Sequence, residues 1–200
     1  MPNDTPSLSN EGRRWTTLSS AKLLERWWIT LRADHVRLPS GVEMEEFHVA
    51  EYPDWALAVA LTEDGQAVLV EQYRYAVDRV GLEFAAGVVH AGEPPLEAAR
   101  RELLEETGYV ANEWTALGRC AVEPSRHTNY GHLFVARGAR RVGAPQLDET
   151  EDLRVRLVDA GDLAGLVERG EIVHGTHIAA VFWAMQRGLI GDGARSVDGG

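Results

Sequence analysis

Short runs of β-forming residues, separated by turn residues, dominate the pattern of the first half of the chain. The turn signals are Pro39-Ser40-Gly41, Pro53-Asp54 and Asp64-Gly65. Runs rich in β-branched, aromatic and other apolar residues between such signals are typical of strands. We therefore predict strands over residues 27–31, 42–49, 55–61, 67–73 and 82–89.

A helical period begins at Pro94 and Pro95, where the strand-type pattern stops. Leu96, Ala99 and Leu103 have the i, i+3, i+7 spacing of an apolar helix face. Proline is favoured in the first turn of a helix and glycine just after its end, so Gly108 predicts a helix that ends at Thr107. The remaining pattern predicts strands over 116–122, 132–136 and 153–158, and helices over 162–169 and 176–187.

This order of elements predicts a mixed α/β (α+β) sandwich rather than a doubly wound parallel sheet. Neither G-x-G-x-x-G nor G-x-x-x-x-G-K-[ST] occurs in the chain. Residues 1–20 and 191–200 are polar, without an apolar period, and are expected to be flexible tails. Residues 21–50 are expected to form an N-terminal antiparallel strand region, and residues 51–190 the main domain.

Composition narrows the classes of partner. The formal net charge of −11 disfavours sequence-independent binding to nucleic-acid phosphates and favours divalent cations as partners. No apolar run approaches the ~18 residues of a membrane-spanning helix, and the first ten residues lack the pattern of a signal peptide. The single cysteine, Cys120, cannot form an intramolecular disulfide, which fits a reducing compartment. We therefore expect a cytoplasmic protein with no membrane or nucleic-acid partner.

The predicted helix over 95–107 carries an unusual concentration of carboxylates. At 100° per residue, Glu102, Glu105 and Glu106 lie within an arc of ~100° on one helix face. Like charges this close repel, so a cation should neutralise them. A solvated acidic face with Glu97 and Arg101 as an i,i+4 ion pair is the alternative interpretation.

The residues around this helix decide between the two interpretations. They follow the spacing G-x5-E-x7-R-E-[apolar]-x-E-E-x-G, and all eight specified positions are filled. This pattern resembles the Nudix box, the signature of hydrolases that cleave a nucleoside diphosphate linked to another group. Tyr109 stands where the family usually has a bulky aliphatic residue. The eight positions are Gly87, Glu93, Arg101, Glu102, Leu103, Glu105, Glu106 and Gly108.

The resemblance implies a Nudix αβα sandwich around a mixed β-sheet. It also implies that Glu102, Glu105 and Glu106 bind Mg²⁺ or Mn²⁺, and that Arg101 orients a ligating carboxylate. Hard oxygen ligands and substrate phosphates are what Mg²⁺ prefers. Gly87 lets the backbone approach the metal, so the carbonyl oxygen of Ala86 is a further candidate ligand.

Three segments outside the box resemble the ADP-ribose and nucleoside-diphosphate-sugar pyrophosphatase branch. Residues 69–74 and 82–87 are similar to its E-Q-x-R and L-E-x-P-A-G motifs, with Ala85 in place of proline. Pro124 lies near a proline common in ADP-ribose hydrolases, but in a Glu-Pro-Ser context. The acidic stretch 147–153 resembles a mobile loop that carries the catalytic base.

The alignment to this branch assigns roles to two residues of the acidic stretch. Glu149 is the candidate base that activates water, and Glu151 an additional metal ligand. Glu105 on the helix is the alternative base, since it has the same chemistry. A solvated turn without a catalytic role would also explain the acidic residues.

Other side chains are candidates for binding the substrate. Arg74 and Arg79 can bind a diphosphate with planar guanidinium groups, or can instead pair with a nearby acid: Glu71, Asp78 or Glu83. Trp27, Trp28, Tyr52 and Trp55 could stack on adenine, although aromatic residues in strands more often belong to a core or an interface. His127, His132, His174 and His177 lack the spacing of a zinc site and are expected on the surface or in the core.

The expected activity is metal-dependent hydrolysis of a nucleotide sugar, with ADP-ribose giving AMP and ribose 5-phosphate. Another nucleotide sugar, such as GDP-mannose, is one alternative, and a non-catalytic module that senses ADP-ribose is the other. Related pyrophosphatases pair their subunits through an N-terminal sheet. With its adjacent tryptophans, the region 21–50 therefore predicts a homodimer.

Overall fold

A computed structural model describes residues 9–191 of the chain. The chain divides into two compact units. In the described residues, the N-terminal unit comprises 9–52 and 123–128, and the main unit comprises 53–122 and 129–191. The segment 123–128, which contains Pro124, thus belongs to the N-terminal unit although it interrupts the main unit in sequence.

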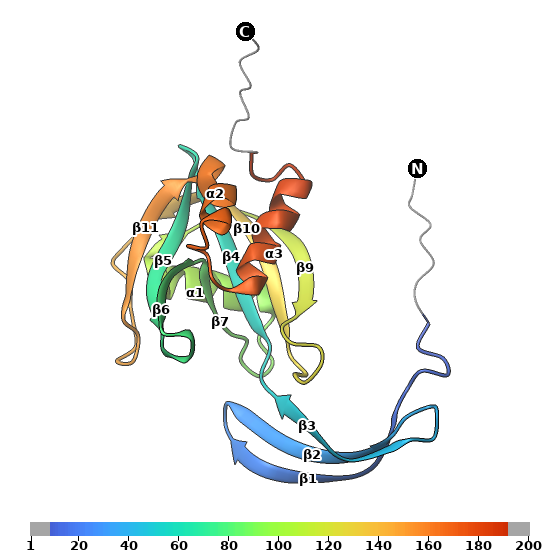
Figure 1. The fold of residues 1–200 in the computed structure, drawn as a ribbon. Coiled ribbons are helices and arrows are strands. Elements are labelled where there is room, and N and C mark those ends of the chain that lie inside the picture. Colours follow the sequence, from blue (N-terminus) through green and yellow to red (C-terminus); the bar gives the residue numbers. More distant parts are fainter. Residues whose placement is uncertain (1–8, 192–200) are drawn as a thin grey trace, which may run out of the picture. The chain divides into compact units, whose positions relative to one another are not determined.

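The N-terminal unit is an antiparallel sheet of three strands in the order β1-β2-β3 (Figure 1). These are β1 (Thr16–Arg26), β2 (Ile29–Arg37) and β3 (Glu43–Glu51). The segment 123–128 forms a single parallel bridge to β3, in which Ala50 donates its N–H to Arg126 O at 2.9 Å and accepts from Thr128 N–H at 3.2 Å. The hydrophobic pattern within each segment does not predict this pairing, because the two segments are far apart in the sequence.

The first strand corrects the predicted tail over residues 1–20. Residues 16–20 belong to β1 and pair with β2 from Thr16↔Arg37 onward. Every residue of β1 is exposed, so the strand has no apolar face that a sequence pattern could reveal. Its pairing depends on backbone hydrogen bonds, which polar side chains permit. Of the tail predicted over 191–200, residues 192–200 lie outside the described part.

The main unit contains a mixed eight-stranded sheet (Figure 1). Its central strands run in the order β11-β5-β4-β10-β8, with β4 parallel to β10 and antiparallel to β5. β6 pairs with β5, β7 with β4 and β9 with β10. The strands are β4 (Trp55–Thr62), β5 (Gln66–Arg74), β6 (Arg79–Glu83), β7 (Ala85–Val88), β8 (Tyr109–Val110), β9 (Glu113–Ala121), β10 (Tyr130–Arg141) and β11 (Leu153–Asp159).

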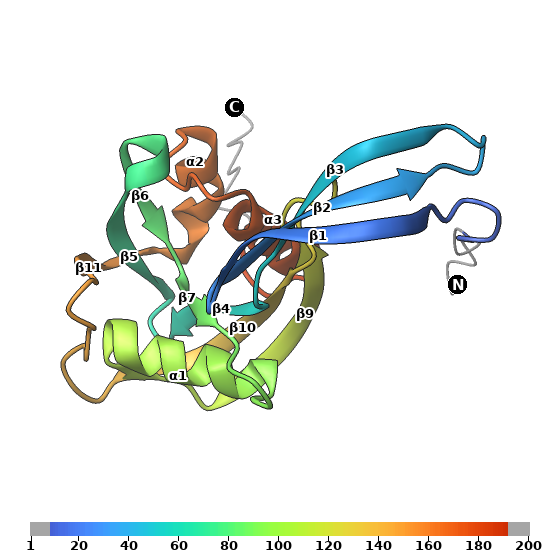
Figure 2. The same ribbon diagram turned by 90° about the horizontal axis from the view of Figure 1, so that it is seen from below.

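Helices cover both faces of this sheet, so the predicted αβα sandwich is confirmed (Figure 2). α1 (Pro95–Thr107) lies on one face, and α2 (Leu163–Glu168) and α3 (Gly175–Gln186) lie on the other. Two short 3-10 turns, η1 (Tyr75–Val77) and η2 (Ala160–Asp162), complete the described elements. Within residues 9–191, no helix combines the length and apolar character needed to cross a membrane.

The side chains of β4 alternate between two hydrophobic cores. Leu57 and Val59 belong to the core beneath α2 and α3, whereas Ala56, Ala58 and Ala60 belong to the core beneath α1. Because alanine is small, α1 packs close to the sheet. The alternation of a central strand therefore determines which helix approaches the strands most closely.

The single strand predicted over 82–89 is two strands in the structure. β6 pairs with β5 and β7 pairs with β4, and Phe84 stands between the two strands. β4 and β5 pair directly only over Ala60–Leu61 and Ala67–Val68, so they diverge beyond this point. The segment that crosses the gap brings Glu83 into the protein interior and sends Ala86 and Gly87 toward α1.

Candidate active site

The site is built on α1, which begins and ends as its sequence predicts. Pro95 lies in the first turn, and Gly108 follows the last turn with φ of 73°, a conformation that favours glycine. Ala99 and Leu103 are fully buried against the sheet, and Leu96 packs at the edge of the same core. The apolar face predicted for this helix is confirmed.

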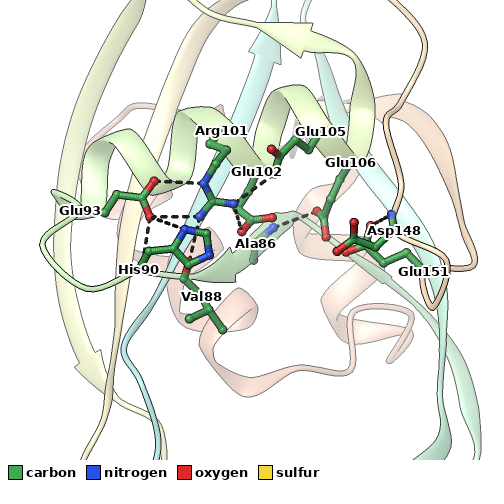
Figure 3. Close-up of polar contacts among 10 residues, drawn as sticks. All are labelled: Ala86, Val88, His90, Glu93, Arg101, Glu102, Glu105, Glu106, Asp148 and Glu151. Carbon is green, nitrogen blue, oxygen red and sulfur yellow. Dashed lines mark hydrogen bonds and ion pairs between the residues drawn. The ribbon is translucent and has the colours of Figure 1, made fainter. Parts of the chain in front are cut away.

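Burial of the apolar face carries two of the three glutamates into the protein. Glu102 and Glu106 are buried, whereas Glu105 is half-exposed. The carboxylate of Glu102 packs directly on Gly87, where a Cβ atom would overlap it. Glu106 accepts a hydrogen bond from the N–H of Ala86 at 3.0 Å (Figure 3). The absence of a side chain at Gly87 thus lets the Glu102 carboxylate approach the backbone closely.

Arg101 organises the acidic face by donating hydrogen bonds in several directions (Figure 3). Its Nε and Nη2 contact the two oxygens of Glu93 at 3.0 and 3.1 Å, and Nη2 also donates to the carbonyl of Val88 at 2.9 Å. Its Nη1 donates to Glu102 at 2.7 Å and to Glu105 at 3.1 Å. The i,i+4 pair between Glu97 and Arg101 does not form, because Arg101 is turned toward these partners.

The pKa shifts of the carboxylates around Arg101 differ in direction. Hydrogen bonds from Arg101 lower the pKa of Glu93, in the segment before α1, to about 2. Burial raises the pKa of Glu102, and burial with the nearby charges of Glu102 and Glu151 raises the pKa of Glu106 to about 8. Burial disfavours the ionised form of these two carboxylates, and a bound cation would stabilise that form.

A loop after β10 lies beside the end of α1. Gln146 donates its N–H to the carbonyl of Glu105 at 2.7 Å, and Val142 donates to that of Gly108 at 2.8 Å. These bonds position the turn in which Asp148 N–H bonds the Glu151 carboxylate at 2.9 Å. Figure 3 shows Glu106 between Ala86 and the loop side chains Asp148 and Glu151.

The predicted base, Glu149, lies in the same turn but does not reach the helix. Its side chain is exposed and makes no hydrogen bond within residues 9–191. The turn therefore brings Glu151 to the carboxylates of α1 and leaves Glu149 in solvent. Asp148, which was not among the sequence candidates, accompanies Glu151 because the turn closes between these two residues.

The two candidate arginines are placed differently. Arg74 contacts both oxygens of Glu83, which corresponds to one of the pairings considered from the sequence. Arg79 is exposed and makes no ion pair among the described residues; its guanidinium lies near Gly170. The charges of Arg74 and Glu106 interact.

Two of the aromatic candidates are exposed, and the other aromatic and histidine candidates contact other side chains of the protein. Trp27 is 87% exposed at the turn between β1 and β2, and Trp28 is also exposed. Tyr52 packs on His127 within the N-terminal unit. Trp55 packs against His174 and His177 in the main unit. His132 pairs with Asp54, and His174 caps α3 by accepting from Thr176.

The donor chemistry of the site fits a hard divalent cation. Glu102, Glu106 and Glu151 repel one another, and all of them offer oxygen ligands, which Mg²⁺ and Mn²⁺ prefer. In the described part of the chain, no three His, Cys, Asp or Glu side chains are already grouped as ligands. Arg101 holds Glu102 and Glu105, and the Ala86 N–H holds Glu106.

The raised pKa of Glu106 makes the stability of the metal-free protein depend on pH. The pKa is 4.5 in the unfolded chain and about 8 in the folded protein, so between these values the folded protein binds more protons. In EDTA, the free energy of unfolding should therefore fall as pH rises from about 5 to 8. Glu106→Gln, which is neutral but still accepts from Ala86, should reduce this slope.

Urea unfolding at several pH values in EDTA measures the effect. Glu97→Gln is the matched control, because Glu97 is exposed on the same helix and should leave the slope unchanged. A slope that is equally steep in wild type and Glu106→Gln would show that Glu106 is already ionised in the folded protein. Saturating Mg²⁺ should stabilise the wild type most at high pH, since metal and proton compete for the carboxylate.

Comparison with known protein families matches both units of the chain. The NUDIX domain matches residues 52–180, and the nucleoside diphosphate sugar hydrolase N-terminal domain matches residues 15–49. A crystal structure of an ADP compounds hydrolase has a TM-score of 0.77 and 22% identity, covering 88% of this chain and 94% of that one. This likeness shows the fold.

Individual relatives are similar over most of their length. The ADP-ribose pyrophosphatase of Mycobacterium tuberculosis is 35% identical over 167 residues, covering 82% of this chain and 80% of that protein. The ADP-ribose pyrophosphatase of Bacillus subtilis is 30% identical, covering 78% and 84%. The methanol dehydrogenase activator of Bacillus methanolicus is 32% identical, covering 68% and 73%. The chain belongs to the Nudix hydrolase family, with the N-terminal domain of nucleoside diphosphate sugar hydrolases.

Proposed function

We propose that this protein hydrolyses the diphosphate of a nucleotide sugar in a reaction that depends on Mg²⁺ or Mn²⁺. The substrate that we favour is ADP-ribose, which yields AMP and ribose 5-phosphate. The observation that carries the proposal is the buried pair Glu102 and Glu106 on α1, beside Ala86 and the loop residue Glu151. Two relatives over most of the chain are named ADP-ribose pyrophosphatases, which supports the choice of substrate.

The metal would be held by Glu102, Glu106 and Glu151, with the Ala86 carbonyl and Glu105 as further ligands. When bound, it supplies positive charge that stabilises the phosphate oxygens and the leaving phosphate. Arg101 keeps Glu102 and Glu105 oriented by donating to both.

The remaining proposed residues act on water and on the diphosphate. Glu149 takes a proton from the attacking water as its oxygen bonds to phosphorus and the bridging P–O bond breaks. Because Glu149 is exposed in a loop turn, this role requires the turn to move onto the bound substrate. Arg74 and Arg79 bind the diphosphate oxygens through their guanidinium groups.

A panel of nucleotides with and without metal tests the function. ADP-ribose, GDP-mannose and another nucleoside diphosphate sugar are incubated with the full chain in Mg²⁺, Mn²⁺ or EDTA, and products are separated by chromatography. We expect AMP and ribose 5-phosphate from ADP-ribose only when metal is present. Preferred cleavage of GDP-mannose would change the substrate, and binding of ADP-ribose without cleavage would identify a sensor instead of an enzyme.

We also propose that the chain forms a homodimer through the N-terminal unit. Exposed apolar side chains gather on its strands and turns, which an isolated subunit rarely tolerates. They are Trp15, Leu18, Leu23, Leu24, Trp27, Trp28, Val42 and Met44. Light scattering coupled to gel filtration should give twice the 22.0 kDa chain mass.

A pair of variants tests whether these residues form the interface. Leu23→Ser with Trp27→Ser should shift the protein toward monomer, because both side chains lie exposed on the N-terminal unit. Phe182→Ser is the control, since Phe182 is 57% exposed on α3 of the main unit. A wild-type mass of one chain at micromolar concentration would contradict the proposed dimer.

The proposed partners are small molecules. The net charge of −11 argues against a nucleic-acid partner. We propose no membrane partner. We place the enzyme in the cytoplasm, where the unpaired thiol of Cys120 would stay reduced.

A further inference from the structure

Arg74, which the proposed reaction uses to bind the diphosphate, forms a charged pair with Glu83, a residue that has no role in that reaction. Arg74 at the end of β5 directs Nε to Oε1 and Nη2 to Oε2 of Glu83 on β6, both at 2.7 Å. The two strands pair in a register that brings Arg74 opposite Arg79 and Val70 opposite Glu83. Two parallel hydrogen bonds fix the plane of the guanidinium as well as its position.

The two partners are buried to very different extents. Glu83 is 2% exposed, whereas the side chain of Arg74 is 46% exposed. Removing a carboxylate from water is costly, and this cost offsets much of the attraction within a buried pair. Net stability is therefore a weak reason for a buried Glu83, and a role for the half-exposed Arg74 is a stronger one.

His177 of α3 supports Glu83 from the protein interior. Phe84, the residue after Glu83, donates its N–H to His177 Nδ1 at 3.0 Å. Since Nδ1 accepts this hydrogen bond, the ring proton of neutral His177 is on Nε2. Nε2 lies 3.8 Å from Glu83 Oε2, and burial keeps the pKa of His177 well below its usual range. The imidazole thus presents an N–H edge, without a full charge, to the carboxylate.

Arg74 keeps donors available beyond this pair. Glu83 uses Nε and one N–H of Nη2, and Nη1 makes no hydrogen bond within residues 9–191. The positive charge of Arg74 acts to lower the pKa of Glu106. The unused N–H groups therefore belong to a guanidinium that is fixed in orientation, half-exposed and close to the proposed metal ligands.

We infer that Glu83 is a positioning residue, which holds Arg74 so that the unused N–H groups of Arg74 bind the substrate diphosphate beside Glu106. This inference rests on the proposed function and deepens it. The pairing with Glu83 and the binding of phosphate are then compatible, because they use different edges of one planar group. In this inference Glu83 itself touches neither substrate nor metal, because it is 2% exposed and directs both of its oxygens to Arg74.

A double-mutant cycle on the full chain tests the inference. Kinetics with ADP-ribose and saturating Mg²⁺ are measured for Arg74→Ala, Glu83→Gln and the double variant. A charge-assisted hydrogen bond is worth about 10–100-fold, so Arg74→Ala should raise KM by roughly that factor. Glu83→Gln should raise KM about tenfold with a smaller change in kcat, because glutamine has one acceptor oxygen and cannot form both parallel hydrogen bonds to Nε and Nη2.

The decisive result is the behaviour of the double variant. If Glu83 acts through Arg74, the double variant should lose no more kcat/KM than Arg74→Ala alone. Losses that multiply would overturn the inference. Glu71→Gln is the matched control, because Glu71 on β5 is likewise held by an arginine, Arg156, at 3.0 and 2.8 Å. Its KM should remain at the wild-type value.

A further variant keeps the test valid if Glu83→Gln does not fold. Arg74→Lys retains the charge at a half-exposed position but cannot contact Glu83 and phosphate with two edges. Its KM should approach that of Arg74→Ala, and a wild-type KM would overturn the inference. Failure of the wild type to cleave any nucleotide of the panel would instead overturn the proposed function and this inference with it. Cleavage with multiplicative losses would overturn the inference alone.

Discussion

Glu106→Gln should lower kcat/KM for ADP-ribose by roughly 10²–10⁴-fold at saturating Mg²⁺ while the fold is retained. A catalytic metal contributes several kcal/mol to the stabilisation of transition-state charge, which corresponds to that range of rates. Glutamine keeps the shape of the side chain and its hydrogen bond from the Ala86 N–H. The substitution thus removes the negative charge of a buried, proposed metal ligand and little else.

Glu102→Gln should have an effect of the same size, with one difference in mechanism. Glu102 is also held by Arg101, so its loss frees one donor of that arginine. Glu97→Gln, on the exposed side of the helix, should retain wild-type kcat/KM. Steady-state kinetics over a range of Mg²⁺, with circular dichroism to verify the fold, measure all three variants. Near-wild-type turnover by Glu106→Gln would show that the metal is not bound at this helix.

Glu149→Gln should lower kcat by about 10²–10⁴-fold, the usual cost of removing a general base, with little change in the apparent affinity for metal. Two features favour Glu149 over Glu105. Glu105 already accepts from Arg101, whereas Glu149 is exposed and makes no hydrogen bond within residues 9–191. A loop residue can also arrive after the substrate binds.

Metal titrations of neighbouring variants separate the base from the ligands. Glu151→Gln should weaken the apparent affinity for Mg²⁺, and activity should partly recover at higher Mg²⁺, because Glu151 lies beside Glu106. The opposite pattern, an unchanged kcat in Glu149→Gln together with a collapse in Glu105→Gln, would assign the base to the helix.

Local sequence determined the helix of the site and its chemistry. The i, i+3, i+7 spacing of Leu96, Ala99 and Leu103 is a property of neighbouring residues, and so are the proline start and the Gly108 end of α1. The same periodicity places Glu102 and Glu106 on one face. Most strands of the main unit were also predictable, because the alternation in a strand such as β4 reflects two cores on its two sides.

The tertiary structure decided which partners the charged side chains have. Arg101 pairs with Glu93 rather than Glu97, because the segment after β7 brings Glu93 to the helix. Arg74 pairs with Glu83 because β5 and β6 share a register, and His177 joins them from α3. Such contacts depend on how turns, strand register and helix packing orient the chain, and several acids near Arg74 were equally plausible from sequence alone.

Among the backbone elements, too, some were predictable from local sequence and others were decided by the tertiary structure. The helix and the buried strands were predictable because each carries its own hydrophobic period, which burial on one or two faces imposes on a segment. β1, whose residues are all exposed, and the pairing of residues 123–128 with β3 carry no such period. Both depend on hydrogen bonds between backbone groups, which are the same for every residue except proline, so only the tertiary structure could decide them.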